Sequence, residues 1–256
     1  MSSSVHPLGI IAALPEEIAD LGDALVVDET AIRGELAFRR GRLDGAPVMV
    51  VEGGIGKVNS AWVTGLLLDR FDCRGVLFTG VAGGLDPTLK IGDVVVADRL
   101  IQHDYGAVAD QRFRRFRPGL PPFGEPRHQL AYEMAPELRG ILAEALPKVE
   151  LPLLPATTTG GSARQPLVRF GTILSGDQFI NCKATREELF ATFAAQAVEM
   201  EGAAIAQVAE RYNAPCIVVR CLSDLAGADS HIDFATFLSA AAESAARVVR
   251  HLVHVL

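Results

Sequence analysis

Carboxylates and an arginine at the ends of two apolar segments are the residues of this chain best suited to do chemistry. The first segment ends in Glu199 and Glu201, and the second contains Arg220 and ends in Ser223 and Asp224. A strand that ends where a helix begins projects its side chains into the crevice beyond the sheet, where open α/β sheets bind ligands. The two segments are therefore predicted to be neighbouring strands whose polar ends meet in one site.

A solvated strand end is the ordinary explanation for a pair of glutamates such as Glu199 and Glu201. Here both interrupt apolar sequence, and small residues follow them, which favours a buried site instead. Strict alternation along a strand places Glu199 and Glu201 on one face and Met200 on the other. If all three residues line one pocket, the end of this strand must be irregular.

Apolar runs and helical patterns alternate along the chain. The predicted strands, besides the two above, are 8–14, 35–41, 46–52, 75–79, 93–98 and 170–174, and the predicted helices begin after Pro15, at 57–71, at the capping box Thr185–Glu188 and at 234–253. Strands that alternate with helices imply a largely parallel or mixed sheet flanked by helices. We expect an α/β fold, a three-layer α/β/α sandwich with a mixed, largely parallel sheet, built by residues 1–256 as a single domain.

Residues 106–169 differ from the rest of the chain, because prolines recur there and the run Thr157–Ser162 is rich in small polar residues. We expect one helix, near Pro136 to Leu146, within an otherwise irregular excursion. Long irregular segments in compact domains are usually lids, binding loops, interface arms or disordered loops. Part of this excursion is therefore expected to cover the site.

The overall charge argues against a nucleic-acid partner. The chain of 256 residues carries a formal net charge of -7, whereas proteins that bind nucleic acids usually present a basic face to the phosphates. The basic run Arg112–Arg117 is the local exception, and we interpret it as a solvated or interface segment.

Cysteine usage and the N-terminus indicate a cytoplasmic protein. The four cysteines lack the C-x-x-C spacing and are predicted to be reduced core thiols; they are Cys73, Cys182, Cys216 and Cys221. The first residues do not show a basic region followed by an apolar core, and no apolar stretch is long enough for a membrane span. We expect a soluble protein without a membrane partner.

Two glycine-rich segments are predicted to be turns that approach a ligand. In Gly53–Val58, a phosphate-loop interpretation fails because Val51 and Val58 occupy positions that need a glycine and a hydroxyl, and the dinucleotide fingerprint is incomplete. What remains is a strand-to-helix turn, with Ile55 at its tip, that lets the backbone come close to a ligand. The second segment, Thr79–Leu85, has no nearby cation and suits an uncharged ligand.

Metal and serine-hydrolase chemistry are not indicated. The six histidines are scattered, and none pairs with cysteines or carboxylates at the spacing of metal ligands. The sequence also lacks the Gly-x-Ser-x-Gly turn of serine hydrolases. We therefore predict neither a metal site nor a cofactor.

Six motifs in a fixed order give the chain a resemblance that covers most of its length. They are Gly9–Leu14 with Glu17, Gly54–Val58, Thr79–Leu85, Ser175–Ile180, Val198–Glu201 and Arg220–Asp224. With these motifs the chain resembles the purine nucleoside phosphorylase superfamily, and within it the 5′-methylthioadenosine/S-adenosylhomocysteine nucleosidases. The resemblance implies hydrolysis of an N-glycosidic bond, which releases adenine and a 5-thioribose derivative without a cofactor.

The resemblance also implies roles for the reacting residues. Asp224 matches the general acid that protonates adenine N7, a role in which a carboxyl must stay protonated near neutral pH, as burial favours. Glu17 matches the base that activates water on the opposite face of the sugar, and Arg220 the residue that orients Glu17 or the water. An acid and a base on opposite sides of a sugar is also the arrangement of inverting glycosidases.

The remaining implied residues bind the nucleoside. Glu201 matches the ligand of the ribose 2′-hydroxyl, and Met200 packs on the ribose. Phe179 stacks on adenine, while the backbone of Ile180 reads its Watson–Crick edge. The other residues expected to line the substrate pocket are Glu199, Ser223, Ile55, Ala82, Gly83 and Leu14.

Two departures from the family pattern concern the water and the 5′ group. Val81 replaces a serine that many members place beside the water. The segment 107–169 is longer than in compact relatives, so the residues of the 5′-thio pocket are not assigned. Because relatives complete that pocket with a partner subunit, we expect a homodimer, with Phe113, Phe116 or Phe123 as candidate contributors.

Three other functions remain open at this point. A phosphate-dependent nucleoside phosphorylase would share the fold, but a phosphate would meet Glu17 unfavourably. A nucleosidase for another 5′-modified nucleoside, such as futalosine, differs only in the unassigned segment. A non-catalytic nucleoside-binding module would not require Glu17, Glu201 and Asp224 together.

Overall fold

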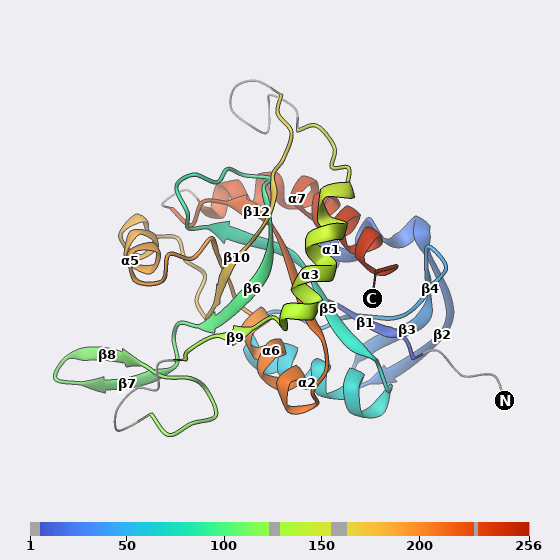
Figure 1. The fold of residues 1–256 in the computed structure, drawn as a ribbon, viewed down its shortest axis with the longest axis horizontal. Coiled ribbons are helices and arrows are strands. Elements are labelled where there is room, and N and C mark those ends of the chain that lie inside the picture. The colour runs from blue at the N-terminus through green and yellow to red at the C-terminus, as the bar shows by residue number, and fades with distance from the viewer. Residues whose placement is uncertain (1–5, 123–128, 155–162, 228–229, 256) are drawn as a thin grey trace.

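The computed structural model describes residues 6–122, 129–154, 163–227 and 230–255. Its centre is a mixed sheet of ten strands in the order β11-β10-β6-β12-β5-β1-β4-β3-β2, with β9 added beside β6 (Figure 1). In chain order the strands are β1 (Leu8–Ala12), β2 (Leu25–Arg33), β3 (Leu36–Leu43), β4 (Ala46–Glu52), β5 (Gly75–Gly84), β6 (Val94–Gln102), β9 (Tyr132–Glu133), β10 (Val168–Ser175), β11 (Ala197–Glu199) and β12 (Cys216–Asp224).

Helices cover both faces of this sheet, as expected for a three-layer α/β/α fold. The helices are α1 (Glu16–Ala19), α2 (Lys57–Gly65, continued by a π turn at Leu66–Arg70), α3 (Pro136–Ala145), α5 (Lys183–Phe193), α6 (Gly202–Arg211) and α7 (Ser230–Leu252). In Figure 1, α1, α3 and α7 lie on one side of the sheet, and α2 and α6 lie on the other. The predicted fold class is confirmed.

Alternation along the central strands fills two separate cores. On β12, Val218 packs in the core beneath α2 and α6, whereas its neighbours Ile217 and Val219 pack in the core beneath α7 and α3. Successive side chains of a strand point to opposite faces, so a strand buried on both faces must be apolar throughout. This requirement explains the uninterrupted apolar runs that the sequence shows for β1, β5 and β12.

The sheet closes on itself at the end where the site lies. The three-residue strand β11 pairs in parallel with β10, where Ser175 is the partner of Glu199. Its other edge pairs antiparallel with β5, where Gly83 is the partner of Val198. The predicted segments that end in Glu201 and Asp224 are therefore not adjacent strands, because β5 lies between them on this side of the sheet.

The sequence predicted a turn for the second glycine-rich segment, Thr79–Leu85. In the structure this prediction is wrong, because most of the segment forms the last half of β5. Pairing of β5 with β12 continues through Gly83, and pairing with β11 through Gly84. A Cβ atom at Gly80 would lie 2.1 Å from both Arg220 Nη1 and Glu17 Oε1, and one at Gly83 would lie 3.0 Å from Asp224 Oδ1. These glycines therefore admit polar side chains against a strand instead of reversing the chain.

Other differences from the sequence predictions are local. The strand β2 was not predicted, and Thr185 lies inside α5 because that helix begins at Lys183 after Cys182 as its N-cap. Cys182 is exposed, so the expectation of four core thiols is wrong for this residue. The remaining predicted strands and helices are confirmed within a few residues at their ends.

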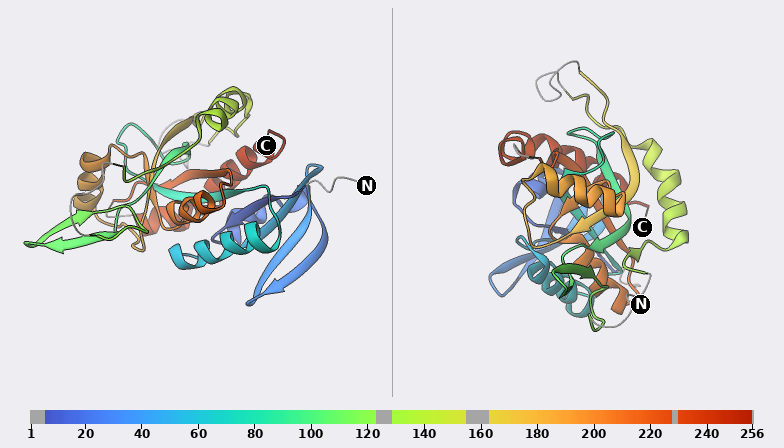
Figure 2. Two further views of the ribbon diagram at one scale, coloured as in Figure 1. Left: turned by 60° about the horizontal axis from the view of Figure 1, so that its bottom comes forward. Right: turned by 90° about the vertical axis from the view of Figure 1, so that its left-hand side faces the viewer.

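The excursion contains more regular structure than its composition indicated. The predicted helix is present as α3, but β7 (Gly106–Ala109) and β8 (Arg112–Arg115) also form a hairpin that projects from the body of the molecule (Figures 1 and 2). The basic run is therefore largely β8, and Phe116 is only 6% exposed. Phe123 and Thr157–Ser162 lie outside the described residues. None of the described helices is both long and apolar enough to cross a membrane.

Candidate active site

A small cavity at the carboxyl ends of β1, β5, β11 and β12 gathers the candidate residues. It has a volume of about 100 Å³ and is lined by Ala13, Leu14, Glu17, Ile55, Val81, Ala82, Gly83, Phe179, Val198, Glu199, Met200, Glu201, Ser223, Asp224 and Phe234. Two predicted site residues do not line it. Arg220 lies fully buried beneath the carboxylates, and the Ile180 side chain packs in an apolar cluster with Leu85 and Leu174.

Glu199, Met200 and Glu201 can face one pocket only if the strand ends irregularly, and the structure shows such an irregular end. β11 stops at Glu199, and Met200 and Glu201 form a bend before α6 begins at Gly202. Glu199, Met200 and Glu201 consequently all face the same cavity.

Glu199 is bound mainly by the protein itself. Its carboxylate accepts hydrogen bonds from the Glu201 amide at 3.1 Å and the Gly202 amide at 2.8 Å, at the N-terminus of α6. The Ser175 hydroxyl also donates to it and in turn accepts from the Ala203 amide at 2.7 Å. A carboxylate at this position satisfies amides that a helix leaves unpaired and interacts favourably with the helix dipole. Glu199 thus orders the strand-to-helix junction that carries Glu201.

Arg220 is the one cation among the buried side chains around this cavity in the described chain. Its Nη2 lies 2.8 Å from Glu199 Oε2 and 3.3 Å from Glu201 Oε2, and its Nη1 lies 3.8 Å from Glu17 Oε1. The guanidinium also stacks on the Phe78 ring, 3.6 Å from its centroid. Three carboxylates therefore share a single positive charge in a region from which water is largely excluded.

Burial raises the pKa of two of these carboxyls. Burial raises the pKa of Glu17, although the Arg220 charge and the amides of Val81, Leu14 and Ala13 oppose the shift. Burial and the Glu199 charge raise the pKa of Glu201, against the influence of Arg220. Both glutamates therefore hold a proton more strongly than an exposed carboxyl does.

Backbone amides hold Glu17 in place. Its Oε2 accepts from Ala13 at 2.8 Å and Leu14 at 3.0 Å, and its Oε1 accepts from Val81 at 3.0 Å. Glu17 itself lies in the first turn of α1, directly after β1. The carboxylate thus connects the ends of β1 and β5 on one wall of the cavity.

Asp224 lines the same cavity at the end of β12, where the strand is irregular. The register with β5 shifts between Leu222 and Asp224, which is the signature of a β-bulge. Ser223 Oγ donates to Asp224 Oδ2 at 3.0 Å, and the Ala226 amide donates to Oδ1 at 2.8 Å. These contacts fix the carboxyl at the rim of the cavity, where it is 2% exposed.

Aromatic side chains form the mouth of the cavity. Phe179 is 51% exposed and meets Phe234 edge to face, with ring centroids 6.0 Å apart. Sequence reasoning identified Phe179 but missed Phe234, Ala13 and Val198. Phe234 begins the apolar pattern of the last helix, and nothing in that pattern separates a cavity-lining residue from a core residue.

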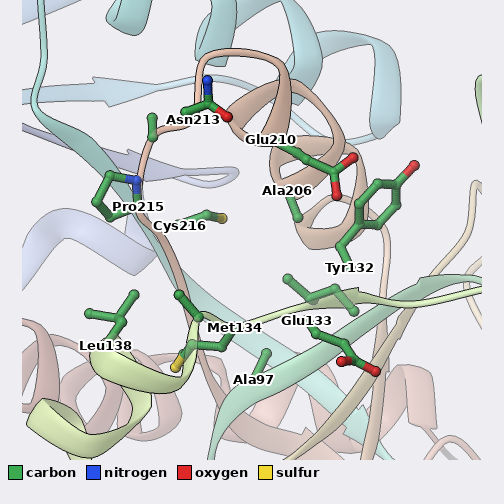
Figure 3. Close-up of a pocket in the computed structure, with 13 residues that line it drawn as sticks. Ala97, Tyr132, Glu133, Met134, Leu138, Ala206, Glu210, Asn213, Pro215 and Cys216 are labelled. Carbon is green, nitrogen blue, oxygen red and sulfur yellow. The ribbon is translucent and has the colours of Figure 1, made fainter. Parts of the chain in front are cut away.

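The rest of the structure adds no competing centre within the described residues. No group of three or more His, Cys, Asp or Glu side chains there is arranged to hold a metal ion. The described part of the excursion does not line the cavity. A larger cavity, of about 360 Å³, lies between β9, α6 and the start of β12, and its walls are mostly apolar (Figure 3).

Comparisons with known proteins identify the family. The model of the phosphorylase superfamily matches residues 7–254. The chain is 45% identical to the 5′-methylthioadenosine/S-adenosylhomocysteine nucleosidase of Mycobacterium tuberculosis over 97% of each chain.

Solved structures agree in fold. Futalosine hydrolase of Helicobacter pylori superimposes with a TM-score of 0.80 at 32% identity, covering 100% of both chains. The S-adenosylhomocysteine nucleosidase of Streptococcus pyogenes, in complex with 5-methylthiotubericidin, gives a TM-score of 0.81 at 30% identity and covers 100% of this chain and 99% of its own. The chain therefore belongs to the phosphorylase superfamily and, within it, to the family of 5′-methylthioadenosine/S-adenosylhomocysteine nucleosidases.

Proposed function

We propose that the protein hydrolyses the N-glycosidic bond of 5′-methylthioadenosine and S-adenosylhomocysteine, releasing adenine and the corresponding 5-thioribose derivative. The observation that carries the proposal is that Asp224 and Glu17 line the same small cavity, with Arg220 paired to Glu17. In the proposed mechanism Asp224 is the proton donor for the base and Glu17 the proton acceptor for water, on opposite sides of the bound nucleoside.

Asp224 acts as the general acid. As the C1′–N9 bond breaks, its electron pair moves into the adenine ring, and the proton of Asp224 passes to N7. The other carboxyl oxygen accepts from the exocyclic amine, the Hoogsteen pattern of an adenine. Support comes from Ser223 and the Ala226 amide, which fix the orientation of this carboxyl.

Glu17 acts as the base for water. A raised pKa makes a carboxylate a better proton acceptor near neutral pH, and burial raises that of Glu17. The water oxygen forms the new bond to C1′, and Glu17 takes the proton that the water loses. Arg220 keeps Glu17 in position through the ion pair at 3.8 Å and balances its negative charge until Glu17 takes the proton from water.

The remaining cavity residues bind the nucleoside. Glu201 accepts the ribose 2′-hydroxyl, and Met200 packs against the sugar. Phe179 stacks on adenine, for which its half-exposed ring at the cavity mouth is suited. The Ile180 backbone reads the Watson–Crick edge; its buried side chain anchors the loop that carries both residues.

Hydrolysis is favoured over phosphorolysis by the charges at the cavity. The described lining contains Glu17, Glu199, Glu201 and Asp224 but no lysine, arginine or histidine. Arg220 beneath the lining is already paired with these carboxylates. A phosphate ion would therefore enter a region of excess negative charge, whereas a water molecule would not.

A homodimer is part of the proposal. Ile55, Val58 and Trp62 follow one another at helical spacing around the start of α2 and are 50%, 80% and 43% exposed. Ile55 lines the cavity, so a second copy that covers this apolar face would also close the 5′ end of the site. On the hairpin, Val108 and Phe113 are further exposed apolar residues that such a copy would cover.

We also propose a cytoplasmic location, where free cysteines stay reduced.

Futalosine is the second candidate substrate, because futalosine hydrolase of Helicobacter pylori shares the fold over the full chain. Futalosine is a nucleoside with another 5′ modification. Glu17, Glu201 and Asp224 would serve both reactions, and only the segment 107–169 would distinguish the two substrates.

The test is adenine release from 5′-methylthioadenosine and from S-adenosylhomocysteine, in phosphate-free buffer and with added phosphate. We expect release that does not depend on phosphate and that falls at least about hundredfold in Asp224→Asn, the usual contribution of a general acid. Release that requires phosphate would assign the protein to the phosphorylases. Hydrolysis of futalosine alone would select the second candidate, and nucleoside binding without turnover would support a binding module.

A further inference from the structure

Lys57 connects three segments that meet beside the nucleoside cavity. It follows the ribose-side turn Gly53–Gly56, whose Ile55 lines the cavity. Its Nζ lies 2.6 Å from Asp104 Oδ1, just beyond the end of β6. The same Nζ lies 3.5 Å from Asp177 Oδ2, in the loop after β10 that carries Phe179.

Backbone hydrogen bonds reinforce this ion-pair cluster. The Lys57 amide donates to Asp177 Oδ1 at 3.0 Å, and the Asp177 amide donates to Asp104 Oδ2 at 2.8 Å. Both aspartates are therefore bonded to backbone as well as to the ammonium group. The three residues form a closed ring of contacts, which we call the Lys57 clamp.

The clamp continues directly into the proposed active site. The Gly56 amide, one residue before Lys57, donates to Glu201 Oε1 at 2.7 Å. Gly56 has a φ of 100°. A Cβ there would lie 3.5 Å from Asp177 Oδ1. A continuous path of hydrogen bonds thus joins Glu201, on the ribose side, to the loop that carries Phe179 on the purine side.

The clamp is shielded enough to hold its geometry. The side chains of Lys57 and Asp104 are each 17% exposed. Burial raises the pKa of Asp104, but the hydrogen bonds from Lys57 and the Asp177 amide outweigh it and hold this pKa below its usual value. Asp177 is 52% exposed, so the pair that it forms with Lys57 is the part that salt screens most readily.

We infer that Lys57, with Asp104 and Asp177, is a positioning residue that fixes the ribose-side turn and the purine-side loop relative to each other, so that base and sugar are bound as one ligand. This inference rests on the proposed function and adds residues that do not touch the nucleoside. Fixing both half-sites increases the affinity for a ligand that spans them but not for one that occupies a single half-site.

That difference separates positioning from ordinary stabilisation. In Lys57→Met, the dissociation constant of 5-methylthiotubericidin should increase about tenfold or more, while that of adenine should change less than about threefold. Isothermal titration calorimetry measures both constants on the intact protein. Lys148→Met, which removes an exposed lysine outside the site, is the matched control and should change neither.

A double-mutant cycle tests the partner. Asp104→Asn should reproduce the selective loss, and Lys57→Met with Asp104→Asn should be little worse than either single change, because all three variants break the same contact. Lys57→Arg, which keeps the charge, should recover most of the affinity for 5-methylthiotubericidin.

Salt supplies a measurement on the wild type should Lys57→Met fail to fold. Raising the ionic strength should weaken the binding of 5-methylthiotubericidin more than the binding of adenine, because salt screens the charges of the clamp. The inference would be overturned if both ligands lost affinity equally, or if Lys57→Met lost no affinity for 5-methylthiotubericidin. Failure of the wild type to release adenine from either substrate would reject the proposed function alone, because the affinity ratio is measured without turnover.

Discussion

The two ends of β12 border two cavities of opposite character. Cys216, at its start, faces the larger cavity of about 360 Å³, whereas Asp224, at its end, faces the smaller one of about 100 Å³. The larger cavity is lined mostly by apolar side chains, and its Glu210 is exposed and paired with Arg117. The smaller one concentrates four buried carboxylates above one buried arginine. The volume of a cavity therefore does not identify the site. The buried charges that the fold holds in place identify it.

The largest expected effect comes from removing the cation of the smaller cavity. Arg220→Met leaves Glu17, Glu199 and Glu201 buried without a counter-charge and should lower the free energy of unfolding by about 3–5 kcal/mol. Urea unfolding measures the change. Arg117→Met, near the larger cavity, removes a pair whose Glu210 is 60% exposed and a stacking contact with Tyr132, and should cost only about 1–2 kcal/mol. Similar costs for the two arginines would contradict the comparison.

A methyl group provides a finer steric test. Gly80→Ala places a Cβ 2.1 Å from Arg220 Nη1 and Glu17 Oε1, at a φ of 152°, and should reduce adenine release at least about tenfold and stability by about 1–3 kcal/mol. Steady-state kinetics and thermal unfolding read the two effects. Gly140→Ala, in the α3 helix near the larger cavity, meets nothing within 4 Å and should leave activity unchanged and stability equal or greater. An active Gly80→Ala enzyme would show that the Glu17–Arg220 contact tolerates displacement.

The pH dependence of stability should differ between the two regions. A carboxyl whose folded pKa is raised contributes stability that is complete below its unfolded pKa and is lost as the pH rises through the folded pKa. Burial and the Glu199 charge raise the pKa of Glu201, so Glu201→Gln should become more stable relative to wild type as the pH rises above about 4.5. Denaturant unfolding at several pH values measures this trend. Asn213→Ala, at the larger cavity, should show a constant difference from wild type, and a constant difference for Glu201→Gln would reject the shift.

The smallest effect is expected at the other end of β12. Cys216→Val adds apolar volume beside the larger cavity and should leave adenine release within about twofold of wild type, since such swaps perturb mainly local packing. A steady-state assay beside the wild type is sufficient. A large loss would show that the larger cavity takes part in the reaction, and it would remove the distinction between the two ends of the strand.

Local pattern was enough to predict most of the elements and many of the cavity residues. Apolar runs marked β1, β11 and β12, and the residues that follow or end them located Glu17, Glu201 and Asp224. Pattern failed at Thr79–Leu85, because a sequence does not tell whether a glycine reverses the chain or admits a side chain such as Arg220 from another strand. That distinction depends on tertiary contacts.

Other features were invisible for the same reason. Glu199 lines the cavity as predicted, but its hydrogen bonds to the Gly202 amide and Ser175, which order the neighbouring Glu201, were not predicted. Phe234 and Ala13 line the cavity only because α7 and the end of β1 are brought together by the sheet. The three-residue strand β11 was predicted, but its pairing with both β10 and β5 was not.

The double pairing of β11 has a consequence for the timing of folding. β11 can dock only when its partners on the two neighbouring strands, Gly83 on β5 and Ser175 on β10, are both in place. These two partners are far apart from each other in the sequence. Contacts that close such long loops form late, because their entropy must be lost before they add stability. During refolding, catalytic activity should therefore return with the slowest phase, and partly folded chains should be catalytically silent even where most of their helices have formed.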